Sequence, residues 1–481
     1  MTFATRRTAN VAQAILLAST LAQWGIALLV TIYLARVLSP AAFGFFALVG
    51  AIFILARKLL DLGLSNTAVR DIARDPRRER PIVEGMMAYR RVAGIVLALV
   101  VGIFALAQKA GPERWLLLAV GTVLLFTAPA ALEPVFQVRQ AQAGPALLNL
   151  VGGLLVLGGS MLFKHAGVAG MAFGWLLVLR EAITLLFTRI LARRLLGYAP
   201  RPGFRVRALQ AFVAPALIFG LASLVYTLYF HCDVFFVYAL RGQDELGAYA
   251  AAFRPINPLI LLPWLLMVPI IPVFSATAAN EGERFVRQVR GACALALGLG
   301  CCALAAGVLL APDLVQLLYR GHYRQGPLSC VEAFRWLALA FSQVCITTVL
   351  TASLLAAGKE KLLLAIGTAA LLVNAAMNLV LLRHYDFTAA AFATAATELL
   401  FLGCAMVGFY VLTGRNALTW RELSYLVPAL VMGVALHFLQ GGAVLRAICG
   451  SLLGLISAGI ILSAPGARRW RADIASVAPV V

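Results

Sequence analysis

The chain has 481 residues, of which 62% are hydrophobic and only 12% are charged. A soluble domain is nearer half apolar and a quarter charged, so the composition predicts an integral membrane protein. The net charge of +20 is compatible with a nucleic-acid partner. However, the basic residues stand in short clusters between apolar runs, where they set membrane topology, so we expect no nucleic acid to bind.

Apolar runs of helix length follow one another along the whole chain. About 20 such residues are needed for an α-helix to cross a bilayer, and the runs are too long for the strands of an outer-membrane barrel. We therefore predict an all-α polytopic membrane protein with about fourteen transmembrane helices. The predicted spans are roughly 11–35, 41–62, 87–108, 115–137, 145–165, 167–189, 210–232, 246–275, 291–312, 331–356, 362–383, 388–412, 424–440 and 443–463.

The positions of Lys and Arg predict the orientation. With the N-terminus in the cytoplasm, about 26 of them fall in cytoplasmic segments and about nine in outer turns. This bias satisfies the positive-inside rule and indicates an even number of spans, with both termini in the cytoplasm.

Two pairs of similar segments indicate an internal repeat. Leu38–Ala47 (LSPAAFGFFA) aligns with Arg241–Ala250 (RGQDELGAYA), and each lies in a short turn between two helices. Gly167–Ala182 matches Asp386–Phe401 at a slightly larger separation, which requires a short insertion in the second half. The predicted domains are a six-helix lobe at 1–195, a basic cytoplasmic linker at 196–209, a second six-helix lobe at 210–412, and two extra helices with a short tail at 413–481.

The same segments carry a family resemblance. The turns with FGFFA and GAYAAAFR, and the segment Leu354–Phe401 with its Gly-Lys turn, its VNAAMNL helix and its AAAFATAATE helix, resemble the polysaccharide flippase branch of the multidrug/oligosaccharidyl-lipid/polysaccharide exporter superfamily. The resemblance implies a V-shaped bundle of two six-helix lobes that moves an isoprenoid-pyrophosphate-linked glycan between leaflets by alternating access through a cationic central cavity.

The resemblance leaves alternatives within the superfamily. A cation-coupled multidrug antiporter and a flippase for the lipid-linked peptidoglycan precursor remain open, whereas a membrane glycosyltransferase would need large outer loops that this chain lacks. We expect a monomer without cofactor, metal or enzymatic activity, located in the bacterial inner membrane. Its expected partners are a lipid-linked oligosaccharide, membrane lipids, and polymerase or assembly proteins of surface polysaccharide such as O-antigen or exopolysaccharide.

Five basic residues fall inside predicted spans: Arg57, Lys58, Arg180, Arg254 and Arg335. Charges in the bilayer core are costly, so such residues are expected to line cavities. Arg254 is about eight residues into its span, or roughly 12 Å deep, and has no acid three or four residues away. It favours a cavity that holds a lipid pyrophosphate, since arginine pairs phosphate oxygens bidentately; Arg180 fits either interpretation.

Local neutralisation is the alternative for the other three basic residues. Arg57 and Asp61 are four residues apart and Glu332 and Arg335 three apart, so each pair can meet on a helix surface. Arg57 and Lys58 also lie near the cytoplasmic end of their span, where long side chains can reach water. We therefore favour neutralisation for these two arginines and for Lys58.

Acidic and amide side chains also fall within spans. Glu398, near mid-membrane, and its approximate counterpart Glu181 are candidates for binding a proton or a sodium ion, although either could pair with an arginine. Asp233 is interpreted as a charge at the end of its span. Asn374 and Asn378 share one helix face, which predicts hydrogen bonds between helices.

The predicted eighth span is rich in proline. Each proline removes a backbone donor and weakens the helix, so we interpret this span as a bent gating helix, with a static kink as the alternative. The prolines are Pro255, Pro258, Pro263, Pro269 and Pro272.

Overall fold

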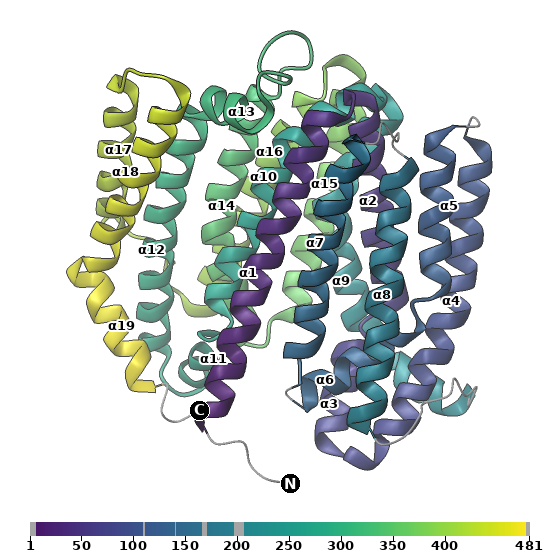
Figure 1. Cartoon of the computed structure of the whole chain (residues 1–481). Coiled ribbons are helices and arrows are strands. Elements are labelled where there is room, and N and C mark those ends of the chain that lie inside the picture. Colours follow the sequence, from purple (N-terminus) through teal and green to yellow (C-terminus); the bar gives the residue numbers. More distant parts are fainter. Residues whose placement is uncertain (1–5, 109–110, 140, 166–170, 197–205, 478–481) are drawn as a thin grey trace. The chain divides into compact units, whose positions relative to one another are not determined.

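A computed structural model describes residues 6–108, 111–139, 141–165, 171–196 and 206–477 (Figure 1). All regular structure in these ranges is helical, which confirms the predicted fold class. The chain divides into two compact units, residues 1–228 and 229–481. The predicted linker at 196–209 lies mostly outside the described residues, and its last four residues begin α9.

The described residues of the first unit form eight α-helices and the start of a ninth. These are α1 (Arg6–Val37), α2 (Pro40–Asp61), α3 (Leu64–Arg74), α4 (Glu79–Ala107), α5 (Pro112–Leu125), α6 (Glu133–Val138), α7 (Ala143–His165), α8 (Met171–Leu196) and the beginning of α9 (Val206–Arg241), with short 3-10 turns at Pro76–Arg78 and Ala128–Leu132. Helices α4 and α5, α1 and α7, and α7 and α8 pack against one another.

In the second unit, the residues that the structure describes form the end of α9 and ten further α-helices. These are α10 (Gln243–Met267), α11 (Ile271–Asn280), α12 (Gly282–Leu309), α13 (Ala311–Tyr319), α14 (Val331–Ala356), α15 (Glu360–His384), α16 (Thr388–Thr413), α17 (Val427–Phe438), α18 (Ala443–Ser463) and α19 (Pro465–Val477), with a 3-10 turn at Glu422–Leu426. Helix α14 is central, since it packs against α10, α12 and α16.

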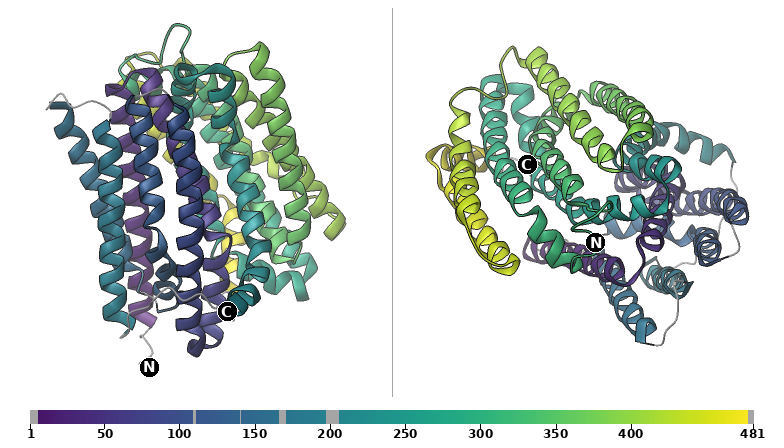
Figure 2. Two further views of the ribbon diagram at one scale, coloured as in Figure 1. Left: turned by 90° about the vertical axis from the view of Figure 1, so that its right-hand side faces the viewer. Right: turned by 90° about the horizontal axis from the view of Figure 1, so that it is seen from above.

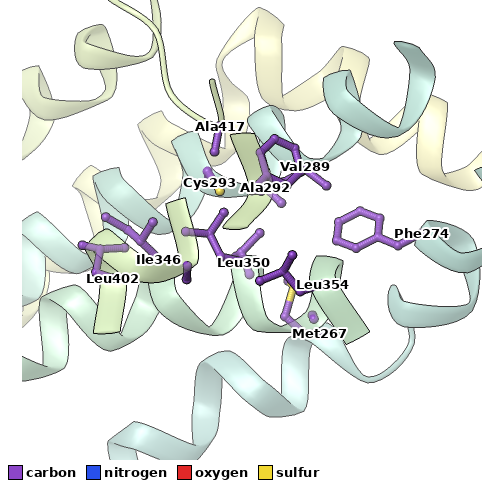
Figure 3. Packing of buried hydrophobic residues seen from close by; sticks show 14 of the residues in the cluster. Met267, Phe274, Val289, Ala292, Cys293, Ile346, Leu350, Leu354, Leu402 and Ala417 are labelled. Atoms are coloured by element: carbon purple, nitrogen blue, oxygen red, sulfur yellow. The ribbon is translucent and has the colours of Figure 1, made fainter. Parts of the chain in front are cut away.

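The second unit is held together by a core of buried aliphatic and aromatic side chains. Met267 of α10, Phe274 of α11, Leu350 and Leu354 of α14 and Leu402 of α16 belong to this cluster (Figure 3). A separate cluster joins α17, α18 and α19 to α12, so the C-terminal helices run alongside α12 (Figure 2).

Every predicted span contains a helix, but not all of these helices are long and apolar. Ten helices of the described residues are long and apolar enough to cross a membrane, or eleven if the bent pair Glu113–Leu125 and Ala128–Val138 counts as one span. The described parts of α1 and α17 give shorter apolar helices, at Leu21–Val37 and Glu422–Phe438.

Two predicted boundaries around the turn at Gly242 are wrong. The seventh span was expected to end at residue 232, but α9 continues to Arg241 because the residues after Asp233 remain apolar. Asp233 therefore lies inside a helix and is not a charge at its end. The eighth span, expected at 246–275, is divided: α10 ends at Met267 and α11 begins at Ile271.

The helix boundaries reproduce the internal repeat. Pro40 and Gln243 begin α2 and α10, and Glu79 and Gly282, which have the same separation along the chain, begin α4 and α12. From α7 and α15 onward, equivalent helices are separated by a longer stretch of chain. The predicted insertion is therefore α13 and the turn after it, which replace the short connection between α4 and α5.

Candidate functional site

A buried carboxylate, Asp233, lies at the centre of a polar cluster in the second unit. Gly242 has φ of +88°, a conformation that favours glycine, and it reverses the chain between α9 and α10. This turn brings Tyr249 of α10 against Asp233, and the Tyr249 hydroxyl donates a hydrogen bond of 2.8 Å to Oδ2. The Asp233 side chain is only 3% exposed, so nearly all its interactions are with protein groups.

Helices α15 and α16 complete the surroundings of Asp233. The Asn378 amide donates to Asp233 Oδ1 at 2.9 Å, and the Thr394 hydroxyl donates to Oδ2 at 2.7 Å. One helical turn before Asn378, Asn374 accepts from Asn378 Nδ2 and donates to Thr397 Oγ1. These contacts confirm the predicted hydrogen bonds between helices from the two asparagines.

Glu398 of α16 is the second buried carboxylate of this unit. It is 3% exposed, and the Tyr229 hydroxyl of α9 donates to its Oε1 at 2.9 Å. Thr397, the residue before Glu398, accepts a hydrogen bond from Asn374, and Asn374 accepts one from Asn378, which donates to Asp233. A chain of hydrogen bonds therefore extends from Asp233 to the residue next to Glu398. Within the described ranges, no Lys or Arg forms an ion pair with Glu398 or Asp233.

The chemistry of the Asp233 cluster suits a small cation. Carboxylate, amide and hydroxyl oxygens are the ligands of hard cations, and one carboxylate balances one positive charge. Asn378 Oδ1 is buried and has no hydrogen-bond partner among the residues that the structure describes. A buried acceptor without a donor is unusual, and a bound cation would satisfy it.

Arg254 lies on α10, little more than one helical turn after Tyr249. Its side chain is half-buried, and within the described part of the chain it forms no ion pair or hydrogen bond through its guanidinium. His231 of α9 is close enough to interact with it electrostatically, and so is Tyr319 of α13. Among the described residues no acidic side chain forms an ion pair with Arg254, and none stands three or four residues from it along α10.

The prolines of α10 are accommodated without ending the helix at once. Pro255, Pro258 and Pro263 lie inside α10, whereas Pro269 and Pro272 lie at the break before α11 and in its first turn. The sequence predicted a bent helix here, and the structure shows a helix interrupted after Met267.

A tyrosine compensates for the first of these prolines. Pro255 has no N–H to donate to the carbonyl of Ala251, four residues earlier. The Tyr319 hydroxyl of α13 donates to that carbonyl at 2.7 Å instead. The buried Tyr319 side chain therefore replaces a missing backbone hydrogen bond.

The candidate basic residues of the first unit have nearby polar groups. Arg57 is half-exposed; its guanidinium lies 3.8 Å from Glu133 and 4.0 Å from Glu181 and lies over the Phe53 ring. Its predicted pairing with Asp61 is wrong, because Asp61 instead accepts from Arg90 at 2.8 Å.

Two further candidates in this unit differ in their degree of pairing. Lys58 is exposed and donates to Ser223 Oγ at 3.2 Å. Arg180 packs over Gly152, where even an added Cβ would lie 2.9 Å from the arginine Cγ. Its Nε is buried and unpaired among the described residues.

Arg335 of α14 forms the predicted ion pair with Glu332, at 2.5 Å, and also donates to the carbonyl of Val308. Its charge is thus largely compensated within the second unit. The eight cysteines are free thiols, five of them buried, as expected for small apolar side chains.

Sequence reasoning placed too little weight on Asp233 and did not identify Tyr249. The apolar run that continues beyond Asp233 to Leu240 indicates that the helix does not end at Asp233. An acid within such a run is expected in the interior of the protein. The helical spacing of Asn374 and Asn378 marked the partner face.

Comparison with known families and structures gives consistent results. A family model described as polysaccharide biosynthesis protein matches residues 12–278, and the MatE model matches residues 219–380. No curated protein sequence matches the chain significantly.

Several solved transporter structures share the fold. The lipid II flippase MurJ in an inward closed conformation has a TM-score of 0.75 at 13% identity, with 93% of this chain and 99% of that chain covered. An inward-facing multidrug resistance MATE family transporter has a TM-score of 0.61 at 18% identity, covering 87% and 98%. A superfamily transporter from Pyrococcus furiosus, described as having a binding pocket of reverse polarity, has a TM-score of 0.53 at 16% identity, covering 94% and 97%.

Proposed function

Because the chain belongs to the polysaccharide biosynthesis protein family, within the multidrug/oligosaccharidyl-lipid/polysaccharide exporter superfamily, we propose that it is a flippase for an isoprenoid-pyrophosphate-linked oligosaccharide. It carries this lipid from the cytoplasmic to the outer leaflet for the synthesis of surface polysaccharide such as O-antigen or exopolysaccharide. The observation that carries the proposal is Arg254, a half-buried cation in an apolar helix without an acidic partner among the described residues.

An uncompensated arginine suits a diphosphate for a physical reason. The diphosphate must cross about 30 Å of hydrocarbon, and a planar guanidinium can pair two of its oxygens while staying charged. The neighbouring His231 of α9 is a candidate for a second hydrogen bond to the diphosphate. In the first unit, Arg180 is the best further candidate, because its Nε has no partner among the described residues.

Net transport against a gradient requires an energy source, and we place the coupling to that source at the two buried acids of the second unit. Asp233 and Glu398 are joined through Asn374, Asn378 and Thr397. Binding of a monovalent cation at Asp233 would neutralise a buried charge that has no basic partner in the described residues. Glu181, in contrast, already lies near Arg57, which weakens its case as a coupling residue.

A reconstituted transport assay tests the proposal. Proteoliposomes containing the purified chain and a fluorescent lipid-diphosphate oligosaccharide are compared for wild type, Arg254→Ala and Arg254→Lys, with the exposed Arg383→Ala as control. Hydrogen bonds to charged groups contribute about 1.5–3 kcal/mol, so Arg254→Ala should reduce transport at least about tenfold. Arg254→Lys should keep part of the activity, and Arg383→Ala nearly all of it.

The same assay separates the alternatives. Equal transport by wild type and Arg254→Ala would refute the diphosphate site. Preference for the lipid-linked peptidoglycan precursor over other glycolipids would make the protein a precursor flippase. Export of organic cations without glycolipid transport would make it a multidrug antiporter.

The proposed location is the bacterial inner membrane with both termini in the cytoplasm, and the proposed partners are the enzymes that polymerise the exported glycan.

A further inference from the structure

A groove of about 1380 Å³ lies in the second unit between the start of α12, the 3-10 turn before α17, and the junction of α18 and α19. Four arginines line it, and we call it the arginine groove: Arg287 and Arg290 of α12, Arg421 directly before the 3-10 turn, and Arg469 of α19. It is distant in sequence from the Asp233 cluster and shares no residue with it.

The acids that line the groove have partners of their own. Glu422 accepts from the backbone N–H of Thr419 at 2.7 Å and from its hydroxyl. Asp473 accepts from Arg284 Nε at 2.7 Å. Arg290 donates through Nε to the Asn416 carbonyl. The groove therefore has an excess of positive charge after its two acids are counted.

The rest of the lining is mostly apolar and includes the ends of helices α17 and α18. Val427 and Pro428 begin α17, and Ile460 lies in the last turn of α18. Trp420 is 88% exposed at the edge of the groove. Tryptophan at the ends of apolar helices is typical of the level at which lipid headgroups lie.

The wall formed by α19 is fixed in place. The Trp470 indole donates to the Gln288 carbonyl of α12 at 2.8 Å. Its ring packs so closely on Gly291 that an added Cβ there would overlap it. Together with the Arg284–Asp473 ion pair, this contact holds α19 against α12, so that Arg469 and the arginines of α12 line the same groove.

We propose that the arginine groove binds one anionic membrane phospholipid, with its phosphate on the arginines and an acyl chain along α17 and α18. The charge distribution predicts that this end of the unit is cytoplasmic, where anionic lipids attract basic segments. A glycolipid fits less well, because sugar hydroxyls need several free polar partners, whereas the Thr419 and Ser424 hydroxyls of the lining already donate to Glu422 and to the Arg421 carbonyl. This lipid is a resident ligand of the C-terminal helices, separate from the transported substrate.

Native mass spectrometry of the full chain in detergent tests the proposal. The probes are phosphatidylglycerol, phosphatidylcholine, inorganic phosphate and farnesyl diphosphate. The groove variant is Arg287→Ala/Arg469→Ala, and the matched control is Arg415→Ala/Arg468→Ala, which removes two exposed arginines near the same helix ends but outside the groove lining.

We expect one tightly bound phosphatidylglycerol, with affinity at least tenfold above that for phosphatidylcholine. Removing two arginines should weaken it about 30-fold, whereas the control should keep it. If the alanine variant does not fold, Arg287→Gln/Arg469→Gln takes its place, and Arg287→Lys/Arg469→Lys should retain binding. Equal phosphatidylglycerol binding by groove variant and control overturns the proposal. So does equal or tighter binding of inorganic phosphate or farnesyl diphosphate, which would indicate an anion site or a substrate site.

Discussion

Replacing Asp233 by asparagine tests whether the buried cluster binds a cation. The variant keeps the size of the side chain and removes its charge. One asparagine oxygen can still accept from Tyr249 and Thr394, which both donate to Oδ2. The new amide group faces the Asn378 amide, which now donates to Oδ1. Rotation of the Asn378 amide would present its unpartnered Oδ1 to the new donor.

The magnitudes of the two effects can be separated. Loss of the Asn378–Asn374 contact on rotation leaves one buried group unpaired, so the substitution itself should cost about 1–3 kcal/mol of stability. A cation that binds only the folded protein adds about 2.7 kcal/mol at 100 times its dissociation constant. This second contribution requires the carboxylate, so it should be present in wild type and absent from the variant.

Thermal unfolding of the detergent-solubilised protein measures both. Wild type, Asp233→Asn and Thr394→Val are compared in sodium chloride and in N-methylglucamine chloride at equal ionic strength. Sodium should raise the melting temperature of wild type, raise that of Thr394→Val less, and leave Asp233→Asn unchanged. An equal sodium shift in wild type and Asp233→Asn would refute the cation site. A shift that follows pH alone would assign the cluster to a proton.

Two other contacts give stability predictions. Tyr319→Phe should lower the free energy of unfolding by about 1–3 kcal/mol, because it leaves the Ala251 carbonyl unpaired. In a Pro255→Ala background the loss should be smaller, because the alanine N–H can donate to that carbonyl. Denaturant unfolding of the double-mutant cycle measures both effects, and additive effects would contradict this reasoning. Gly220→Ala should destabilise by about 1–3 kcal/mol, because a Cβ there would overlap the Leu62 carbonyl group; an unchanged melting temperature would show that α9 can shift without cost.

The fold was largely predictable from the sequence because apolar length and charge bias are local properties of the chain. The repeat was predictable for the same reason: Pro40 and Gln243 begin equivalent helices after similar turns. The extent of α9 was underestimated, since a single acid was given more weight than the apolar residues on both sides of it.

The site was only partly predictable. Arg254 and Glu398 could be identified, because one charge in an apolar helix is conspicuous. Their partners could not, since contacts such as Tyr229 with Glu398 and Arg90 with Asp61 join residues far apart in the chain. Spacing along one helix correctly predicted the pair Glu332–Arg335 but cannot choose among competing partners on other helices.

The position of α13 also bears on the ancestry of the two halves. In the alignment that pairs Pro40 with Gln243, the counterpart of Pro255 is Ile52, which keeps its backbone donor. The inserted helix supplies the hydroxyl that makes a proline tolerable in the second half. Insertion of α13 after a gene duplication would therefore have preceded the proline substitution, or accompanied it. Relatives without a tyrosine at this position of α13 should rarely have the proline, which an alignment of the family would check.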